Sequence, residues 1–276
     1  MLRARPELGA RGLDPLRQAL TRHAPGYGLD WWVDGYQASR AAAVLFAQEL
    51  EGFGGVGERT SPLTRGDVVV LQPGEALDAP LQAGLAIQLP ASAETAGLPT
   101  FLRPDHDPRF TDRPGGCAEE ERAYRRILLT WSDAVGPFVL RALNCHRVRM
   151  DDSLSHYHRP EGGFDELYLV QEVREGACIW WGPAEPIVAE RAATAAEARA
   201  LLRREEVAVG DLLHVPRGTV HRAVGGVLAQ VITVPGFVPG AELGVDHHLR
   251  RLAERFELGP EELPFRAASS EREIVR

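Results

Sequence analysis

Four side chains with metal-binding chemistry stand at regular spacings in the second half of the sequence. His156 and His158 are two residues apart, so on a strand both imidazoles leave the same face of the sheet. Glu166 begins the alternating run Glu-Leu-Tyr-Leu-Val after a double-glycine turn, which predicts its return beside the histidines on the next strand. His221 follows a short apolar strand and a Pro-Arg-Gly turn. Three imidazoles and one carboxylate suit one divalent transition metal and leave two positions open in an octahedral site.

The segment around His221 resembles the second motif of the cupin superfamily. That motif reads Gly, five residues, Pro-x-Gly, two residues, His, and it is matched at Gly210, Pro216, Gly218 and His221. The resemblance implies an all-β, double-stranded β-helix (jelly-roll) fold with peripheral helices. It also implies that the histidines and the glutamate named above are the metal ligands.

The first motif, His-x-His followed by Glu, departs from the cupin pattern in two places. Seven residues rather than three or four separate His158 from Glu166, and Val173 replaces the usual glycine. The longer gap leaves Glu161 as an alternative ligand. Glu166 is favoured because it heads an apolar strand, whereas Glu161 lies in a Pro-Glu-Gly-Gly turn.

A second copy of the same pattern is predicted nearer the N-terminus. Val44–Leu50 aligns with Leu167–Val173 and shares its Gln-Glu pair, and residues 63–74 align with residues 207–218. In this alignment the four candidate ligands correspond to residues that cannot bind a metal: Val33, Gly35, Ala43 and Leu77. The sequence therefore predicts a two-barrel protein, or bicupin, whose N-terminal barrel is degenerate and lacks the ligands.

Five consecutive parts follow from this alignment. They are a helical lead-in (1–30), a degenerate cupin barrel without metal ligands (31–100), a linker and helix (101–136), a metal-binding cupin barrel (137–240), and a C-terminal helix and tail (241–276).

Within these parts, helices are predicted from capping signals and composition. They cover Leu16–His23 after Asp14-Pro15, Ala118–Thr130, an insertion within Pro183–Glu206, and Asp246–Phe256. Phe138–Met150 is predicted as the strand leading into the second barrel.

Composition excludes several classes of function. The net charge is −8 with acids and bases interspersed, which does not predict a nucleic-acid surface. None of the 31 basic residues is lysine, so Schiff-base, pyridoxal-phosphate and P-loop chemistry are excluded. No signal-like segment follows Met1, no apolar run is long enough to span a membrane, and the three cysteines lack disulfide or zinc spacing. A cytoplasmic protein is the expectation.

Several side chains allow two interpretations. Arg141, Arg147 and Arg149 share one strand face, where they either hold a substrate carboxylate or form a solvated face with acidic partners. Tyr168 shares a face with Glu166 and is the candidate catalytic residue, a donor to substrate, unless it only packs in the barrel.

Other polar and aromatic residues have more ordinary roles. One of Trp180 and Trp181 is expected to form a pocket wall, and His214 is expected to be structural. The Asp-His-Asp triplet at residues 105–107 is expected to make local turn contacts.

Metal cupins resembling this chain divide mainly into two chemistries. One is the non-haem Fe(II) dioxygenase, in which substrate and O₂ occupy the open positions, and the other is the isomerase or lyase, in which the metal polarises a carbonyl. Because isomerase-type sugar sites often rely on basic groups such as lysine, a dioxygenase acting on a small organic substrate is preferred. Fe(II) is then the preferred metal, and Mn, Ni, Co or Zn also suit the ligands.

Two alternatives remain. The length, the ligand-free first half and the widened gap resemble the 5-deoxyglucuronate isomerase branch, which predicts a sugar-acid isomerase. A non-catalytic cupin that binds a small molecule is the third possibility. The expected partners are a small-molecule substrate and, from the resemblance alone, a second copy of the chain in a homodimer, with no nucleic acid and no membrane.

Overall fold

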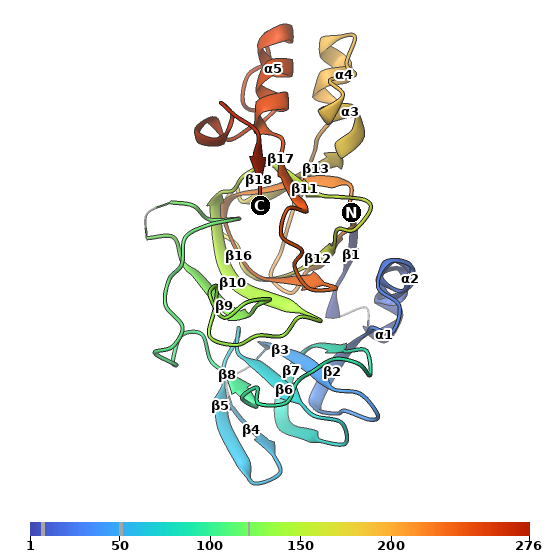
Figure 1. Ribbon diagram of the computed structural model, residues 1–276, viewed down its shortest axis with the longest axis vertical. Helices are drawn as coiled ribbons and strands as arrows, with labels where there is room; N and C mark the ends of the chain where they lie inside the picture. Colours follow the sequence, from blue (N-terminus) through green and yellow to red (C-terminus); the bar gives the residue numbers. More distant parts are fainter. Residues whose placement is uncertain (7–8, 50–51, 121) are drawn as a thin grey trace.

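Two antiparallel sheets, one of seven strands and one of eleven, carry the chain (Figure 1). The computed structural model describes residues 1–6, 9–49, 52–120 and 122–276. The smaller sheet has the strand order β5-β4-β7-β3-β6-β8, with β2 beside β7. Its strands are β2 (Gly28–Gln37), β3 (Ala43–Glu49), β4 (Gly52–Val56), β5 (Arg59–Leu63), β6 (Val68–Leu71), β7 (Ala76–Gln88) and β8 (Phe101–Leu102).

The larger sheet wraps into a nearly closed barrel in the middle of the molecule (Figure 1). Its strands are β1 (Leu2–Ala4), β9 (Arg125–Leu129), β10 (Asn144–Asp152), β11 (His156–His158), β12 (Asp165–Glu172), β13 (Cys178–Pro183), β14 (Arg203–Glu206), β15 (Leu212–Val215), β16 (Thr219–Val234), β17 (Glu242–Gly244) and β18 (Ile274–Val275). The long strand β16 pairs with β10, β11, β12 and β13 in turn. The all-β, jelly-roll fold predicted from the sequence is therefore confirmed.

Helices lie at the periphery. The short helix α1 (Gly9–Gly12) and α2 (Asp14–His23) follow β1, whereas α3 (Ala184–Val188), α4 (Ala195–Arg199) and α5 (Asp246–Phe256) gather at the end of the barrel away from the smaller sheet (Figure 1). A 3₁₀ turn, η2 (Ala267–Ser269), follows α5. No helix in the described part of the chain combines the length and apolar character needed to cross a membrane.

The main hydrophobic core lies between the two sheets, because strands alternate their side chains between two faces. Val44 and Phe46 of β3 pack in one cluster with Leu167 and Leu169 of β12. The intervening residues of β12 point the other way, and Tyr168 packs inside the larger barrel. The position of the smaller sheet thus fixes which residues of β12 face the barrel interior.

Polar contacts cross this interface in both directions, from side chains of each half to backbone groups of the other. The Gln48 side-chain amide donates to the carbonyl of Val170 at 2.8 Å, and Gln230 donates to the carbonyl of Gly66 at 2.7 Å. Arg147 of β10 lies beside Gly66 and donates through Nε to Gln171 at 2.6 Å. Arg147 also pairs with Asp105. These contacts hold the two sheets in register.

Strands β3 and β12 occupy equivalent places in the two sheets. Each is flanked by one short strand and one long strand, and the pairing registers agree: Ala43 pairs with Leu71 and Gln88, and Glu166 pairs with Val215 and Thr233. The alignment of Ala43 with Glu166 therefore agrees with the pairing.

The alignment of His156 with Val33 is wrong. Leu29 of β2 pairs with Ile87, and Cys145 of β10 pairs with Ile232. Ile87 and Ile232 hold equivalent positions on the long strands of the two sheets, so Leu29 corresponds to Cys145. Counting four residues further along each strand, Val33 corresponds to Arg149. The error arises because β10 and β11 are separate strands, whereas the first sheet has only β2 in their place.

Three secondary-structure predictions need correction. The predicted helix Ala118–Thr130, of which residue 121 lies outside the described residues, consists of turns followed by β9, because its second half pairs with β10. The insertion at Pro183–Glu206 forms α3, α4 and β14 rather than one helix, and the strand expected from Phe138 begins at Asn144. The helices over Leu16–His23 and Asp246–Phe256 are confirmed as α2 and α5.

The N-terminal lead-in also contains a strand that sequence analysis did not predict. Leu2–Ala4 pairs antiparallel with Leu212–His214 of β15 and so extends the larger sheet.

Substituting Gly66 tests the interface between the sheets. Gly66 has φ of +98°, and a Cβ there would lie 2.4 Å from Nε of Arg147. Gly74 has a similar φ of +84° but open space around it. Left-handed backbone alone costs an alanine about 1–2 kcal/mol. We expect Gly66→Ala to lower the free energy of unfolding by about 2 kcal/mol more than Gly74→Ala, because Arg147 is displaced. Urea denaturation measures both, and equal losses would contradict a tight interface at Gly66.

Candidate metal centre

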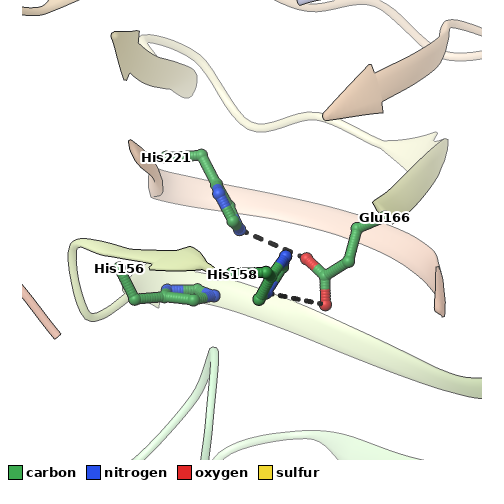
Figure 2. Close-up of side chains that lie close together, drawn as sticks. All are labelled: His156, His158, Glu166 and His221. Atoms are coloured by element: carbon green, nitrogen blue, oxygen red, sulfur yellow. Dashed lines mark hydrogen bonds and ion pairs between the residues drawn. The ribbon is translucent and has the colours of Figure 1, made fainter. Parts of the chain in front are cut away.

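The four predicted ligands meet inside the larger barrel. His156 and His158 come from β11, Glu166 from β12 and His221 from β16 (Figure 2). His156 and His221 are directly paired across β11 and β16. One ligand atom from each of the four residues lies within 4.8 Å of all the others. The cluster thus has the composition and spacing of a divalent-metal site.

Of the two candidate carboxylates, Glu166 lies beside the histidines and Glu161 does not. The Glu166 carboxylate lies 3.2 Å from Nε2 of His221 and 3.8 Å from Nε2 of His158 (Figure 2). Glu161 is exposed in the turn between β11 and β12. The widened gap adds length to that turn and leaves Glu166 at the head of its strand.

Backbone carbonyls orient two of the imidazole rings. Nδ1 of His156 lies 3.0 Å from the carbonyl of Leu154, and Nδ1 of His221 lies 3.1 Å from the carbonyl of Thr219. Since a carbonyl only accepts, each Nδ1 carries the proton and each Nε2 presents a lone pair to the cluster. Nε2 of His156 and Nε2 of His158 are buried without a hydrogen-bond partner among the described residues. Unpartnered imidazole nitrogens are what a metal would coordinate, so these residues fit a divalent ion.

Burial sets the protonation of the cluster. It lowers the pKa of His221 to about 4 and that of His158 well below its ordinary value, so both rings are neutral at pH 7. Burial also raises the pKa of Glu166 to about 7. A carboxylate in this apolar position needs a nearby positive charge to stay ionised, which a divalent cation would provide.

Tyr168 lies beside the cluster but not in the open cavity. Its side chain is 1% exposed and hydrogen-bonds Glu166 and Cys117, and its ring meets His221 edge-on at 5.8 Å. Burial raises the pKa of Tyr168 well above its ordinary value, so the hydroxyl keeps its proton and donates to Glu166. This position suits a residue that orients the carboxylate.

A cavity of about 360 Å³ adjoins Glu166. Apolar side chains of β9, the following turn and the loop before β17 form its walls: Ile127, Leu129, Trp131, Phe237 and Pro239. Its polar lining includes Arg125, Thr130, Asn144, His146, Glu242 and Arg276. A small organic molecule could therefore enter beside the cluster with most of its surface shielded from water.

Sequence reasoning missed this polar lining. Arg125 was placed in a predicted helix, although Arg125, Ile127 and Leu129 alternate as strand residues do. The expected pocket wall at Trp180 or Trp181 is also wrong, since neither lines the cavity, and Trp131 stacked on Phe237 at 4.1 Å does so. Nothing in local spacing indicates that residue 131 lines the cavity.

The arginines of β10 bind protein groups rather than the cavity. Arg147 pairs with Asp105, and Arg149 pairs with Glu172. Arg141 precedes the strand and is exposed. The interpretation as a face with acidic partners therefore holds for the two strand residues, and Arg147 is buried rather than solvated. In the triplet at 105–107, Asp107 pairs locally with Arg109, as expected of a turn, whereas Asp105 pairs with the distant Arg147.

A network of charges fixes the start of β12 from outside the barrel. The buried Asp165 accepts from His214 at 2.8 Å, from the Arg217 guanidinium at 3.0 Å and from His23 of α2 at 2.9 Å. His214 thus has the structural role expected. Because Asp165 and Glu166 are adjacent, anchoring the first on one face positions the second on the other.

No protein-family model and no curated protein sequence matches the chain. Among solved structures, an oxalate decarboxylase aligns with a TM-score of 0.49 and 12% identity, over 91% of this chain and 81% of that one. The formate complex of Lactobacillus farciminis oxalate decarboxylase gives 0.47 and 12%, over 89% and 90%. Vicilin from Solanum lycopersicum (tomato) gives 0.47 and 11%, over 79% of each chain. Similarity at this level does not define a function.

Removing the Tyr168 hydroxyl tests its support of the cluster. Supporting hydrogen bonds to metal ligands are worth about 10- to 100-fold in metal affinity. We expect Tyr168→Phe to fold and to weaken binding of a divalent metal by that factor, measured by competition with a chromophoric chelator. Tyr157→Phe is the matched control, since Tyr157 lies on β11 and packs among the helices instead. Unchanged affinity in Tyr168→Phe would show that the hydroxyl does not support the ligand.

Proposed function

We propose that the chain is a metal-dependent cupin enzyme, in which His156, His158, Glu166 and His221 hold one divalent metal. The observation that carries this proposal is the convergence of four buried ligand atoms within 4.8 Å, one of them on Glu166, which lines a cavity. Neutral imidazoles with lone pairs directed inward and a carboxylate in need of a positive charge support it further.

The more specific proposal is a non-haem Fe(II) dioxygenase acting on a small organic substrate. Bound Fe(II) would supply redox chemistry with O₂ at the positions that the four ligands leave open. The apolar walls at Ile127, Leu129 and Phe237 would hold the substrate beside Glu166 and exclude water. Tyr168 would keep Glu166 in place rather than touch the substrate. Mn, Ni, Co and Zn suit the same donors.

We further propose that the two sheets are copies of one barrel, so that the chain is a bicupin with a degenerate first half. The matching registers around Ala43 and Glu166 support this relationship. Ala43 has no ligand atom, and it packs with apolar neighbours in the smaller sheet.

Metal content tests the proposed ligands. We expect about one metal ion per chain in untagged protein purified without chelator, and a large loss in His221→Ala, because one of four donors is removed. His248→Gln is the control, since His248 lies on α5 outside the barrel and pairs with Glu190 at 2.9 Å. Elemental analysis measures the metal, and circular dichroism checks folding. No metal in the parent after reconstitution with Fe(II), Mn(II) or Zn(II) would sink the proposal.

A second candidate is a metal-dependent isomerase of a sugar acid. The observation favouring it is a second carboxyl group in the cavity, Glu242, which is 7% exposed. Proton-transfer chemistry needs such a group near the metal, whereas a dioxygenase does not.

Oxygen uptake separates the two candidates. For the dioxygenase, we expect the Fe(II) protein to consume O₂ when catechols, diketones or thiols are screened, with Glu242→Gln nearly unaffected. For the isomerase, we expect no uptake but exchange of a substrate C–H with D₂O in a screen of sugar acids. That exchange should fall about 100-fold or more in Glu242→Gln, because general acid–base groups contribute this much. Oxygen electrodes and proton NMR measure the two reactions.

A further inference from the structure

One face of β9 and β10 is directed into the cavity. Arg125, Ile127 and Leu129 alternate along β9 and line the cavity together. His146 of β10 pairs with Ile127, which brings its imidazole to the same lining. Thr130 follows at the end of β9. The polar and the apolar residues of this lining thus come from two adjacent strands.

Three polar atoms of this lining have no partner in the described structure. Nε of Arg125, Oγ1 of Thr130 and Nε2 of His146 are all buried and unpaired. Leaving a buried donor or acceptor unsatisfied costs about 1–3 kcal/mol, and more for a charged group. Three such atoms around one cavity indicate a place for a polar ligand group.

Arg125 is also the cavity's cation without a carboxylate partner among the described residues. Its guanidinium donates through Nη1 to the carbonyl of Arg113 at 3.0 Å and forms no ion pair. By contrast, Arg276 in the same cavity pairs with Glu242 at 3.2 Å. Arg126 on the opposite face of β9 pairs with Asp112 at 2.7 Å. Buried arginines are generally paired, and a planar guanidinium matches a carboxylate.

Another part of the cavity lining is apolar. Trp131 stacks on Phe237 with their ring centroids 4.1 Å apart, and both rings line the cavity with Leu129. Such a wall favours a flat hydrocarbon group, and a volume of about 360 Å³ admits a ring bearing a short substituent.

We infer that the cavity binds an organic monocarboxylate with an apolar, ring-sized body, whose carboxylate is held by Arg125. His146 and Thr130 lie beside that carboxylate, and Trp131 and Phe237 cover the body. Burial and the nearby Arg125 lower the pKa of His146 well below its ordinary value, so that it stays neutral and leaves Arg125 as the charged anchor. The inference deepens the proposed function, on which it rests for the chemistry at Glu166.

Equilibrium binding of two probes of the same shape tests the anchor. Benzoate carries the carboxylate, and benzamide is its neutral counterpart. By isothermal titration calorimetry we expect the full chain to bind benzoate at least about tenfold more tightly than benzamide, since hydrogen bonds to charged groups are worth more than neutral ones. Arg125→Gln should weaken benzoate about 10- to 100-fold, with little effect on benzamide.

Two further variants control this result. Arg126→Gln changes the neighbouring arginine on the outer face and should bind benzoate as the parent does. Arg125→Lys keeps the charge and should retain part of the benzoate preference, as a point charge does. Thermal unfolding and elemental analysis accompany each variant, so that a loss of fold or of metal is seen separately. If Arg125→Gln does not fold, Arg125→Lys tests the anchor instead. A reduced preference for benzoate over benzamide in that variant supports the anchor, and an unchanged preference overturns it.

The outcomes separate this inference from the proposed metal site. Equal affinities for benzoate and benzamide, or no binding of either, would overturn the inference. Benzoate binding that survives in Arg125→Gln but disappears in His221→Ala would place the carboxylate at the metal, which overturns the anchor and leaves the metal site intact. Benzoate binding that depends on Arg125 in a protein without metal would support the anchor while the proposed function fails.

Discussion

The rest of the structure depends on one costly feature, the burial of three imidazoles and a carboxylate inside the larger barrel. Each of these residues is at most 3% exposed, so all four are shielded from bulk water. Burying such groups is unfavourable unless they are paired or coordinate a metal. The surrounding strands therefore have to hold the four side chains close enough for one metal ion to contact all of them.

Strand alternation provides that precision. In β12, Asp165 faces outward into contacts with Arg217 and His214, and Glu166 faces inward. Leu167 then packs against the smaller sheet. A one-residue slip of β12 would bury Asp165 in the barrel and expose Glu166 to the apolar interface, so the outer contacts specify the register of the inner ligand.

In the part of the chain that the structure describes, several charged side chains outside the barrel have protein partners, whereas two of those inside it do not. Outside, Arg147, Arg149 and Arg126 each have an acidic partner within the protein. Inside, Arg125 and Glu166 have no such partner at ordinary ion-pair distance beyond the histidines, within the described residues. Two oppositely charged side chains without protein partners in one cavity are typical of a site that binds charged ligands.

The cluster of three histidines and Glu166 could be predicted because most of its spacing is local. A single residue between His156 and His158 and a turn before Glu166 suffice to place three of them on one barrel face. The cavity could not be predicted in this way. Arg125 and Glu242 are far apart in sequence, and no periodic pattern links them.

Composition also misled the prediction around β9. The Ala- and Glu-rich residues 118–121 favour a helix by propensity, but pairing with β10 gives the following backbone its hydrogen bonds. Strand pairing between residues far apart in sequence cannot be predicted from the residues of one segment alone. The pairing of β1 with β15 is a second example.

The smaller sheet has a structural consequence for the site, whether or not it was once a binding barrel. Its β3 residues Val44 and Phe46 pack on the outer face of β12, and Gln48 bonds the carbonyl of Val170. An apolar residue such as Ala43 at the position equivalent to Glu166 removes the cost of burying a second carboxylate. Through these contacts the smaller sheet supports the strand of the larger sheet that carries Glu166.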